Sequence, residues 1–418
     1  MSKKLLQALT LVLALALFAA GCGGTEGAGD DETTAAEGGD ADEASDTASE
    51  TTDASEDEGT AGGDAPEALT IAVQGPLTGD NAALGINVLC GVQLAVDEAN
   101  EAGELGIELS VEGLDTQGSP DQAPAVAQGA ASNEAIVAMV GPVFSGESAA
   151  AGPIYEEAGL PFVTPSATNP DLSANGWTNF FRTVATDAAQ GPVAAQFIAE
   201  NLGATSVAVI DDSGEYGRGL ADIVASSLEE AGVEVVFRQG VEAGQQDYSA
   251  IVGQVAQSGA EAVFFGGYYS EAGLIRRQLS DAGATDLTFV SDDGAFDPGF
   301  IEGAGADVAE GSFATFPGAD PSSVEQEFLD AYAGVEGCDA PGAYSIEGYQ
   351  NTQLIIQAMQ EGNTDRDSIR EYLAGFSGEV FGKEIEFGDN GDISAQSFFV
   401  YEVVDGEWVQ QEQIEAEV

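Results

Sequence analysis

The chain has 418 residues, enough for two globular domains, and its 44% hydrophobic and 8% aromatic residues are typical of a protein with a full core. Ten Lys and Arg residues face 73 Asp and Glu residues, and the net charge of −63 argues against nucleic acid and anionic membrane surfaces as partners. The chain has no histidine, which excludes a Ser-His-Asp triad, a histidine metal site and an imidazole base.

The chain begins with a segment typical of a secreted protein. Residues 1–22 have a short basic start and an apolar run from Leu5 to Ala20, which is short for a membrane span of about 20 residues and fits a signal peptide over residues 1–21. The end of this segment, FAAGC, resembles a bacterial lipobox, in which the cysteine is lipidated and becomes the new N-terminus. We therefore expect a lipid on Cys22; the alternative is a secreted protein with an unmodified Cys22.

An acidic, low-complexity segment follows. Residues 23–68 contain no Lys, Arg or aromatic side chain, so they cannot bury enough apolar surface to become ordered. Repulsion between the acids should extend the segment. We interpret residues 22–67 as a lipidated Cys with a disordered tether, although a tail that binds a partner is an alternative.

From residue 69 onward, strand and helix patterns alternate. This βαβα alternation predicts an α/β fold with parallel sheets and helices on both faces. Two such blocks, joined near residue 184 and again near 313–316, predict two doubly wound parallel-sheet lobes connected by a multi-strand hinge. The expected lobes comprise residues 68–184 with 315–378, and residues 185–314 with 379–418. Strands are expected at 69–74, 107–115, 136–140, 180–184, 206–210, 233–237, 262–265, 288–290, 384–387 and 398–404. Helices are expected to start at Ser119-Pro120, at Ser145 and at Asp187, and to span 86–102, 216–231, 248–257, 274–282, 324–333 and 346–359.

The stretch from Gly141 to Pro170 combines small residues and hydroxyls with a helix start at Ser145, and it contains no basic residue. A helix N-terminus offers free N–H groups and a favourable dipole, so such a stretch can hold a small carboxylate without a counter-charge. The alternative is a pair of ordinary βα turns in which Ser caps the helix.

The order and spacing of seven segments resemble one known family. From Leu69 to about Glu402, the chain resembles the extracytoplasmic substrate-binding proteins of branched-chain (leucine/isoleucine/valine) amino-acid ABC transporters, which have the type I periplasmic-binding-protein fold and occur in lipoprotein form. The segments are GPLTGDNAALG, GPVFSGESAAAGPIY, LPFVTPSATNPDL, FFRTVATDAAQGP, DDSGEYGRGLA, FFGGYYSEAGLIRRQ and AYSIEGYQNT.

The resemblance implies a binding site. In the family, a Ser at one cleft turn and a Thr at a second hold the ligand's carboxylate, and these positions match Ser145 and Thr168, with backbone groups offered at Ser166. The acid that meets the ligand's ammonium matches Asp293. Such pairing is required because an unpaired buried charge is expensive. The resemblance also matches Tyr216 and Tyr268 to tyrosines that close over the ligand.

The chain departs from the family at several positions. Asp293 replaces the usual Glu, Leu84 stands where a Tyr is frequent, and Phe144 fills the place of a cysteine whose partner position is Gly118. The expected side-chain pocket of Leu84, Val143, Phe144 and Tyr344 is apolar and suits Leu, Ile or Val, and also Phe or an aromatic acid. Arg182, at the lobe junction, is expected to form a structural ion pair.

Two cysteines, Cys90 and Cys338, remain in the folded part, and both fall in segments assigned to the first lobe. Because the location is oxidising, we expect a disulfide between them, the alternative being two free thiols.

The expected function is capture of a small, apolar or branched-chain amino acid between the lobes and its delivery to an ABC permease with its ATPase subunits. The protein is expected to be a monomer, lipid-anchored to the outer face of the cell membrane, with no metal, no cofactor and no enzymatic activity. The alternatives are a ligand-sensing module of the same fold, or a binder of an amide or aromatic acid. Because about 1 M salt shortens the Debye length to roughly 3 Å, the net charge also predicts a protein that works in brine.

Overall fold

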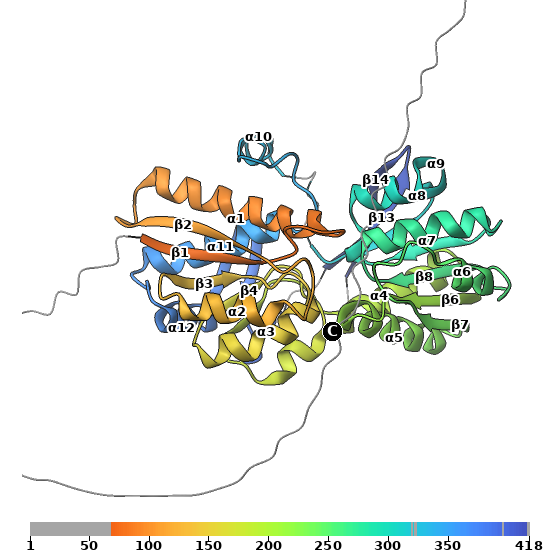
Figure 1. Cartoon of the computed structure of the whole chain (residues 1–418), viewed down its shortest axis with the longest axis horizontal. Coiled ribbons are helices and arrows are strands. Elements are labelled where there is room, and N and C mark those ends of the chain that lie inside the picture. The colour runs from red at the N-terminus through yellow and green to blue at the C-terminus, as the bar shows by residue number, and fades with distance from the viewer. Residues whose placement is uncertain (1–67, 319–320, 322–323, 395–396, 416–418) are drawn as a thin grey trace, which may run out of the picture. The chain divides into compact units, whose positions relative to one another are not determined.

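The computed structural model describes residues 68–415, apart from 319–320, 322–323 and 395–396. The leader, Cys22 and the whole of the expected tether (residues 22–67) lie outside the described residues. The described part contains a five-stranded sheet, a seven-stranded sheet and a separate hairpin (Figure 1). We call the part built on the five-stranded sheet the first lobe and the part built on the seven-stranded sheet the second lobe.

The first sheet has the order β2-β1-β3-β4-β5, and all its neighbours are parallel. Its strands are β1 (Ala68–Gly75), β2 (Glu108–Asp115), β3 (Ile136–Val140), β4 (Phe162–Thr164) and β5 (Phe180–Arg182). The second sheet has the order β14-β13-β10-β9-β8-β6-β7, in which β13 pairs antiparallel with both β10 and β14 and the other pairs are parallel. Its strands are β6 (Ser206–Asp211), β7 (Glu234–Gly240), β8 (Ala262–Gly266), β9 (Thr288–Ser291), β10 (Phe313–Phe316), β13 (Ser397–Val404) and β14 (Glu407–Glu415).

Helices connect most of the parallel strands. They are α1 (Ala82–Ala102), α2 (Ala123–Ser132), α3 (Ser145–Glu157), α4 (Asp187–Gln196), α5 (Glu215–Glu230), α6 (Ser249–Val255), α7 (Tyr269–Asp281), α8 (Pro298–Ala304), α9 (Ala306–Ala309), α10 (Gln326–Tyr332), α11 (Ser345–Gln360) and α12 (Arg366–Ala374), with short irregular helices η1 (Pro170–Asn175), η2 (Phe197–Asn201) and η3 (Asp293–Ala295). The predicted α/β architecture with two parallel-sheet lobes is confirmed.

Alternating side chains of β1 enter two different cores. Ile71 and Val73 pack in the core that includes α1 and α11, whereas Ala72 packs in the core that includes α2 and α3. A strand buried on both faces needs apolar residues at successive positions, which explains the continuous run LTIAV. The helix α1 is long and apolar enough to suit a membrane span by composition, but half of its most apolar window is buried inside the fold.

Two local expectations are wrong. The second helix does not open at Ser119-Pro120: these residues form a turn in which Gln122 N–H donates to Ser119 O, and α2 begins at Ala123. The segment near 384–387 does not close the second sheet, because β11 (Ser377–Val380) and β12 (Lys383–Glu386) pair with each other as a hairpin. In addition, the expected boundary between the two lobes, between residues 314 and 315, falls inside strand β10 of the second sheet.

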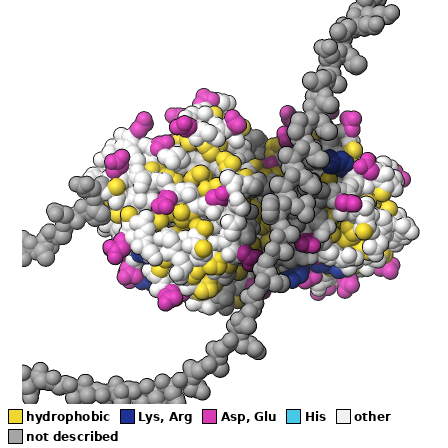
Figure 2. Space-filling model, in the orientation of Figure 1, with side chains coloured by type: hydrophobic (Ala, Val, Ile, Leu, Met, Phe, Trp, Pro, Cys, Tyr) yellow, Lys and Arg dark blue, Asp and Glu magenta, His cyan; other side chains and the backbone are white. Residues whose placement is uncertain are grey.

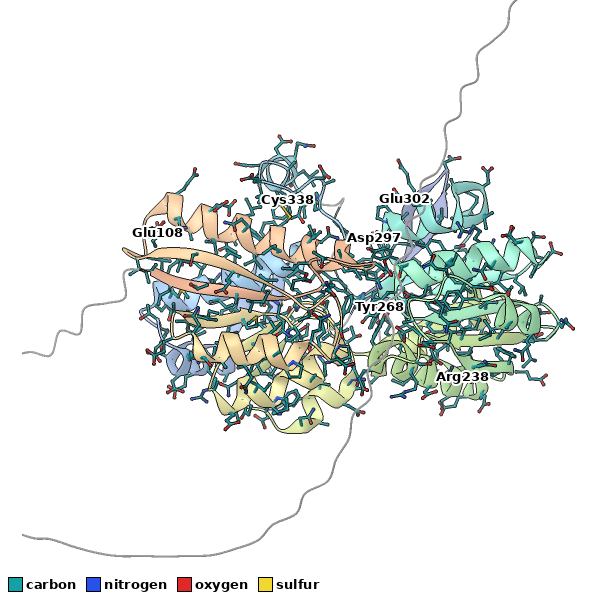
Figure 3. The ribbon with its side chains drawn as sticks, in the orientation of Figure 1. Glu108, Arg238, Tyr268, Asp297, Glu302 and Cys338 are labelled. Carbon is teal, nitrogen blue, oxygen red and sulfur yellow. A yellow bond between two sulfur atoms is a disulfide. The ribbon has the colours of Figure 1, made fainter. Side chains whose placement is uncertain are left out.

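The predicted disulfide is present. Cys90, on α1, is bonded to Cys338, which follows α10, and their Cα atoms lie 6.0 Å apart. Figure 3 shows Cys338 beside α1. The bridge therefore joins two segments of the first lobe that are 248 residues apart in sequence.

The predicted ion pair of Arg182 is also present. This fully buried side chain contacts Asp392 at 2.6 Å. Its guanidinium also donates to the backbone oxygens of Ala167 and Asn169, at 3.0 and 2.7 Å. Arg182 thus ties the loop after β4 to a late segment of the chain.

Candidate ligand-binding site

The first wall of the candidate site is the N-terminus of α3. The helix begins at Ser145, as predicted, and Phe144 precedes it as the N-cap residue in an extended conformation. The fully buried Glu147 accepts hydrogen bonds from Phe144 N–H, at 3.0 Å, and from the Thr116 hydroxyl. Burial raises the pKa of Glu147 to about 7 despite these hydrogen bonds. Glu147 therefore fixes the backbone at the start of the helix.

The loop after β4 lies against this helix start. The Ser166 hydroxyl donates to Val143 O at 2.6 Å, and Asn169 N–H donates to the Ser145 hydroxyl at 3.3 Å. The backbone oxygen of Thr168 accepts a hydrogen bond from Asp187 N–H at 3.0 Å, which connects the loop to the start of α4. The resulting wall is rich in hydroxyl groups and backbone N–H groups, which suits a carboxylate.

The second wall is centred on Asp293, which is 3% exposed. One of its oxygens accepts hydrogen bonds from the Tyr216 hydroxyl and from Gln190, both at 2.7 Å. The other oxygen accepts a hydrogen bond from the Tyr344 hydroxyl. Burial raises the pKa of Asp293, whereas these three donors stabilise its ionised form. A buried carboxylate with this many donors is prepared to pair with a cation.

Further acids lie behind Asp293. Burial, and secondly the charge of Asp293, raise the pKa of the fully buried Asp187 to about 8, while the nearby side chain of Thr168 acts in the opposite direction. Burial and the charge of Asp293 also raise the pKa of Asp292 well above its ordinary value. Burial therefore favours the neutral, protonated forms of these two acids, and Asp293 is the better candidate for the negative charge of the second wall.

Two aromatic rings meet between the walls. The rings of Phe144 and Tyr268 are stacked with their centroids 4.0 Å apart and their planes at 25°. Tyr216 lies next to Tyr268, with the ring centroids 5.4 Å apart. Figure 3 shows Tyr268 at the junction between the two lobes.

The structure brings eight of the nine predicted ligand-binding residues around one cavity. The cavity leaves about 10 Å³ for the centre of a water-sized sphere, and no Lys or Arg is among the described residues that line it. The eight residues are Leu84, Phe144, Ser145, Ser166, Tyr216, Tyr268, Asp293 and Tyr344, and Val143 and Gly294 complete the lining. Thr168 does not line the cavity, although it is buried in the adjacent loop.

Sequence reasoning did not identify Gln190 and Asp187 as part of this region. Both belong to the segment DAAQG, at the first and fourth positions of α4. Residues three apart in a helix lie on one face, so the spacing of Asp187 and Gln190 was the signal in the sequence that could have paired them. In an acidic chain, however, one more Asp at a helix start is uninformative.

A larger hollow of about 410 Å³ is lined by Lys383, Gln350 and Phe381 among others. It adjoins Gly318 and Ser397, whose neighbours 319–320 and 395–396 are not described. None of the predicted ligand-binding residues is among the described residues that line it, so we assign the main site to the smaller cavity.

The chain is similar to several known proteins. Residues 68–407 match the family model described as periplasmic binding protein. A Pseudomonas aeruginosa protein named leucine-, isoleucine-, valine-, threonine-, and alanine-binding protein is 34% identical over 343 residues, which cover 81% of this chain and 90% of that protein.

Two solved structures are also similar. The leucine-binding protein LivK of Thermotoga maritima superposes with a TM-score of 0.75 at 31% identity, covering 83% of this chain and 99% of that one. LivJ of Streptococcus pneumoniae, a branched-chain amino-acid transporter substrate-binding protein solved in complex with isoleucine, superposes with a TM-score of 0.73 at 27% identity, covering 82% of this chain and 100% of that one.

Proposed function

The chain belongs to the periplasmic binding protein family, and on this premise we propose that it captures a small apolar amino acid between its two lobes for an ABC importer. One observation carries the proposal. The start of α3 at Ser145 and the buried carboxylate of Asp293 line the same cavity, so a carboxylate-binding wall faces a cation-binding wall. An α-amino acid carries both groups on one carbon atom.

In the proposed complex, the ligand's carboxylate lies at Ser145 and the loop of Ser166 and Thr168. Its ammonium pairs with Asp293 of the second wall. The side chain then points to the apolar wall of Leu84, Val143 and Phe144. A plain aromatic acid or an amide would leave the carboxylate of Asp293 without a cation, which is unfavourable in a buried site.

The proposed transport cycle follows from the contacts between the lobes. Tyr344 of the first lobe donates a hydrogen bond to Asp293 of the second lobe. The side chain of Asn169, also in the first lobe, donates to the backbone oxygen of Glu215 in the second lobe. These hydrogen bonds form only when the lobes meet, so ligand binding and closure support each other. The closed form would then dock on a permease with its ATPase subunits, as a monomer and without enzymatic activity.

We further propose that Cys22 carries a lipid and that residues 22–67 tether the lobes to the outer face of the membrane. Figure 2 shows Asp and Glu side chains over the visible face of both lobes, with few Lys or Arg side chains. Such a surface is suited to concentrated salt, which screens repulsion.

A ligand screen tests the proposal. Thermal shift and calorimetry in molar salt, with amino acids, amides and aromatic acids, should show stabilisation by apolar L-amino acids. Calorimetry with the matching α-keto acids, which lack the ammonium, should show binding at least tenfold weaker. If no amino acid stabilises the protein, or if the keto acids bind equally well, the proposal is wrong.

A further inference from the structure

The stacked pair of Phe144 and Tyr268 closes the apolar side of the cavity. Phe144 lies at the start of α3 in the first lobe, and Tyr268 lies at the start of α7 in the second. Both rings line the cavity, and Phe144 is only 6% exposed. The stack is therefore a contact between the lobes as well as a boundary of the site.

The ring of Phe144 is also confined by Gly118. Gly118 has a φ of +72°, and a Cβ atom at this position would lie 2.9 Å from Cε2 of Phe144. That distance is shorter than an ordinary contact, so the ring already fills the space that the missing side chain leaves. Phe144 is thus confined both by Gly118 of the first lobe and by Tyr268 of the second.

The rest of the apolar wall is equally tight. Val143 and Leu84 are each 1% exposed. A Cβ atom on Gly75 would lie 2.9 Å from Cβ of Val143, so this side chain has no room to move toward β1. The cavity leaves about 10 Å³ for the centre of a water-sized sphere, which is about the space that one water needs.

We propose that Phe144 limits the size of the ligand's side chain, so that this site prefers short aliphatic amino acids such as alanine, threonine and valine over leucine and phenylalanine. The inference rests on the proposed function and specifies its ligand class. A longer side chain must displace the Phe144 ring, and because the ring already fills the space beside Gly118, it moves only if its stack with Tyr268 opens. Selection therefore acts at lobe closure: a large ligand contacts the open site but keeps the lobes apart.

Calorimetry in molar salt tests this on the full folded protein with L-alanine, L-valine, L-leucine and L-phenylalanine. For the wild type, we expect the Kd for leucine to exceed that for alanine by about tenfold or more, because a single methylene in an apolar pocket is already worth about 10–200-fold and leucine has three more side-chain carbons than alanine. In Phe144→Ala, the ratio of these Kd values should fall by at least about tenfold, mainly through tighter leucine binding. Phe144→Leu, which preserves more of the core volume, should change the ratio in the same direction by a smaller factor.

Phe381→Ala is the matched control, because Phe381 is 43% exposed and does not line this cavity. The ratio of the Kd for leucine to the Kd for alanine in this variant should equal that of the wild type. Small-angle scattering gives a second readout: alanine should reduce the radius of gyration of the wild type more than leucine does, and this difference should vanish in Phe144→Ala.

An unchanged leucine-to-alanine ratio in both Phe144 variants would overturn the size limit while leaving amino-acid binding intact. Equal compaction of the wild type by alanine and leucine would overturn selection at closure. Failure of the wild type to bind any amino acid would instead remove the proposed function.

Discussion

The hydroxyl of Tyr344, in the first lobe, donates a hydrogen bond to the carboxylate of Asp293, in the second lobe. Tyr344 holds this position with a left-handed φ of 67° at the residue that precedes α11. A non-glycine residue in this region is uncommon and costs about 1–3 kcal/mol, so the surrounding contacts must stabilise it. The proposed ammonium-binding acid is thus oriented by both lobes.

Asp293→Ala should weaken amino-acid binding by about 100-fold or more, because it leaves the ligand's ammonium buried without a partner. Calorimetry with the best ligand from the screen measures the loss. Asp307→Ala, which removes an exposed acid from the same lobe, is the control and should bind normally. Equal affinity of the two variants would refute the role of Asp293.

Ser145→Ala should weaken binding by about tenfold, since it removes a hydroxyl that lines the cavity, and Thr168→Ala should weaken it by a smaller factor, since Thr168 lies in the adjacent loop. The loss for each should be smaller than that for Asp293→Ala. Ser226→Ala, at an exposed position on α5, controls for the removal of a hydroxyl elsewhere. Circular dichroism must show folded variants, and undiminished affinity in both would shift the carboxylate to another part of the cavity.

The stability of the ligand-free protein should fall between about pH 4 and pH 8. Burial raises the pKa of Asp187 from 3.8 to about 8, so over this range the folded state keeps a proton that the unfolded state has lost. Stability therefore falls as pH rises, by at most about 1.4 kcal/mol per pH unit for this group, and levels off above its folded pKa. Urea unfolding at pH 5, 6.5 and 8 in constant molar salt measures the slope.

The matched variant is Asp187→Asn, which cannot titrate at this position. Its free energy of unfolding should depend less on pH over the same range. Glu147, whose pKa burial raises to about 7, contributes a fall of the same sign and should preserve part of the slope in the variant. Profiles that coincide for the variant and the wild type would show that Asp187 does not titrate differently in the folded state.

Removal of the disulfide by Cys90→Ser with Cys338→Ser should lower stability by about 5 kcal/mol in the chain-entropy model, because the bond closes a loop of 248 residues. Ligand affinity should stay within about twofold, since neither cysteine lines the cavity. Thiol titration of unreduced, unfolded wild-type protein provides the control. Reactive thiols on both Cys90 and Cys338 would contradict the bridge.

The melting temperature should rise with salt from dilute buffer to molar concentration, because salt screens the repulsion of a net charge of −63. The measurement is a salt series with sodium chloride at constant pH. A melting temperature that falls over this series would refute a protein adapted to brine.

Sequence patterns predicted the parts of the fold that depend on local chemistry. The apolar run of β1 and the start of α3 at Ser145 were predictable because burial on both faces and small polar residues at a helix start leave clear signals. The start of α2 was not, since Ser119-Pro120 fits both a helix start and the turn that it forms. The pairing of β12 with β11 depends on long-range contacts that leave no periodic signal.

The candidate site was predictable only through resemblance, because Asp293 is one acid among 73 in this chain. Resemblance identified the residue, but the donors Gln190 and Tyr344 on its two oxygens come from segments more than 50 residues away on either side. The stack of Phe144 on Tyr268 likewise requires the lobes to meet. Such relationships depend on the tertiary structure.

The bond between Cys90 and Cys338 makes a covalent ring of the chain between them, and strands β6 to β10 of the second lobe all lie within that ring. A protease that cuts once at any loop inside the ring leaves a single molecule under oxidising conditions. Two fragments would separate only after reduction and unfolding. A single cut in the second lobe therefore does not release that lobe while the disulfide is intact.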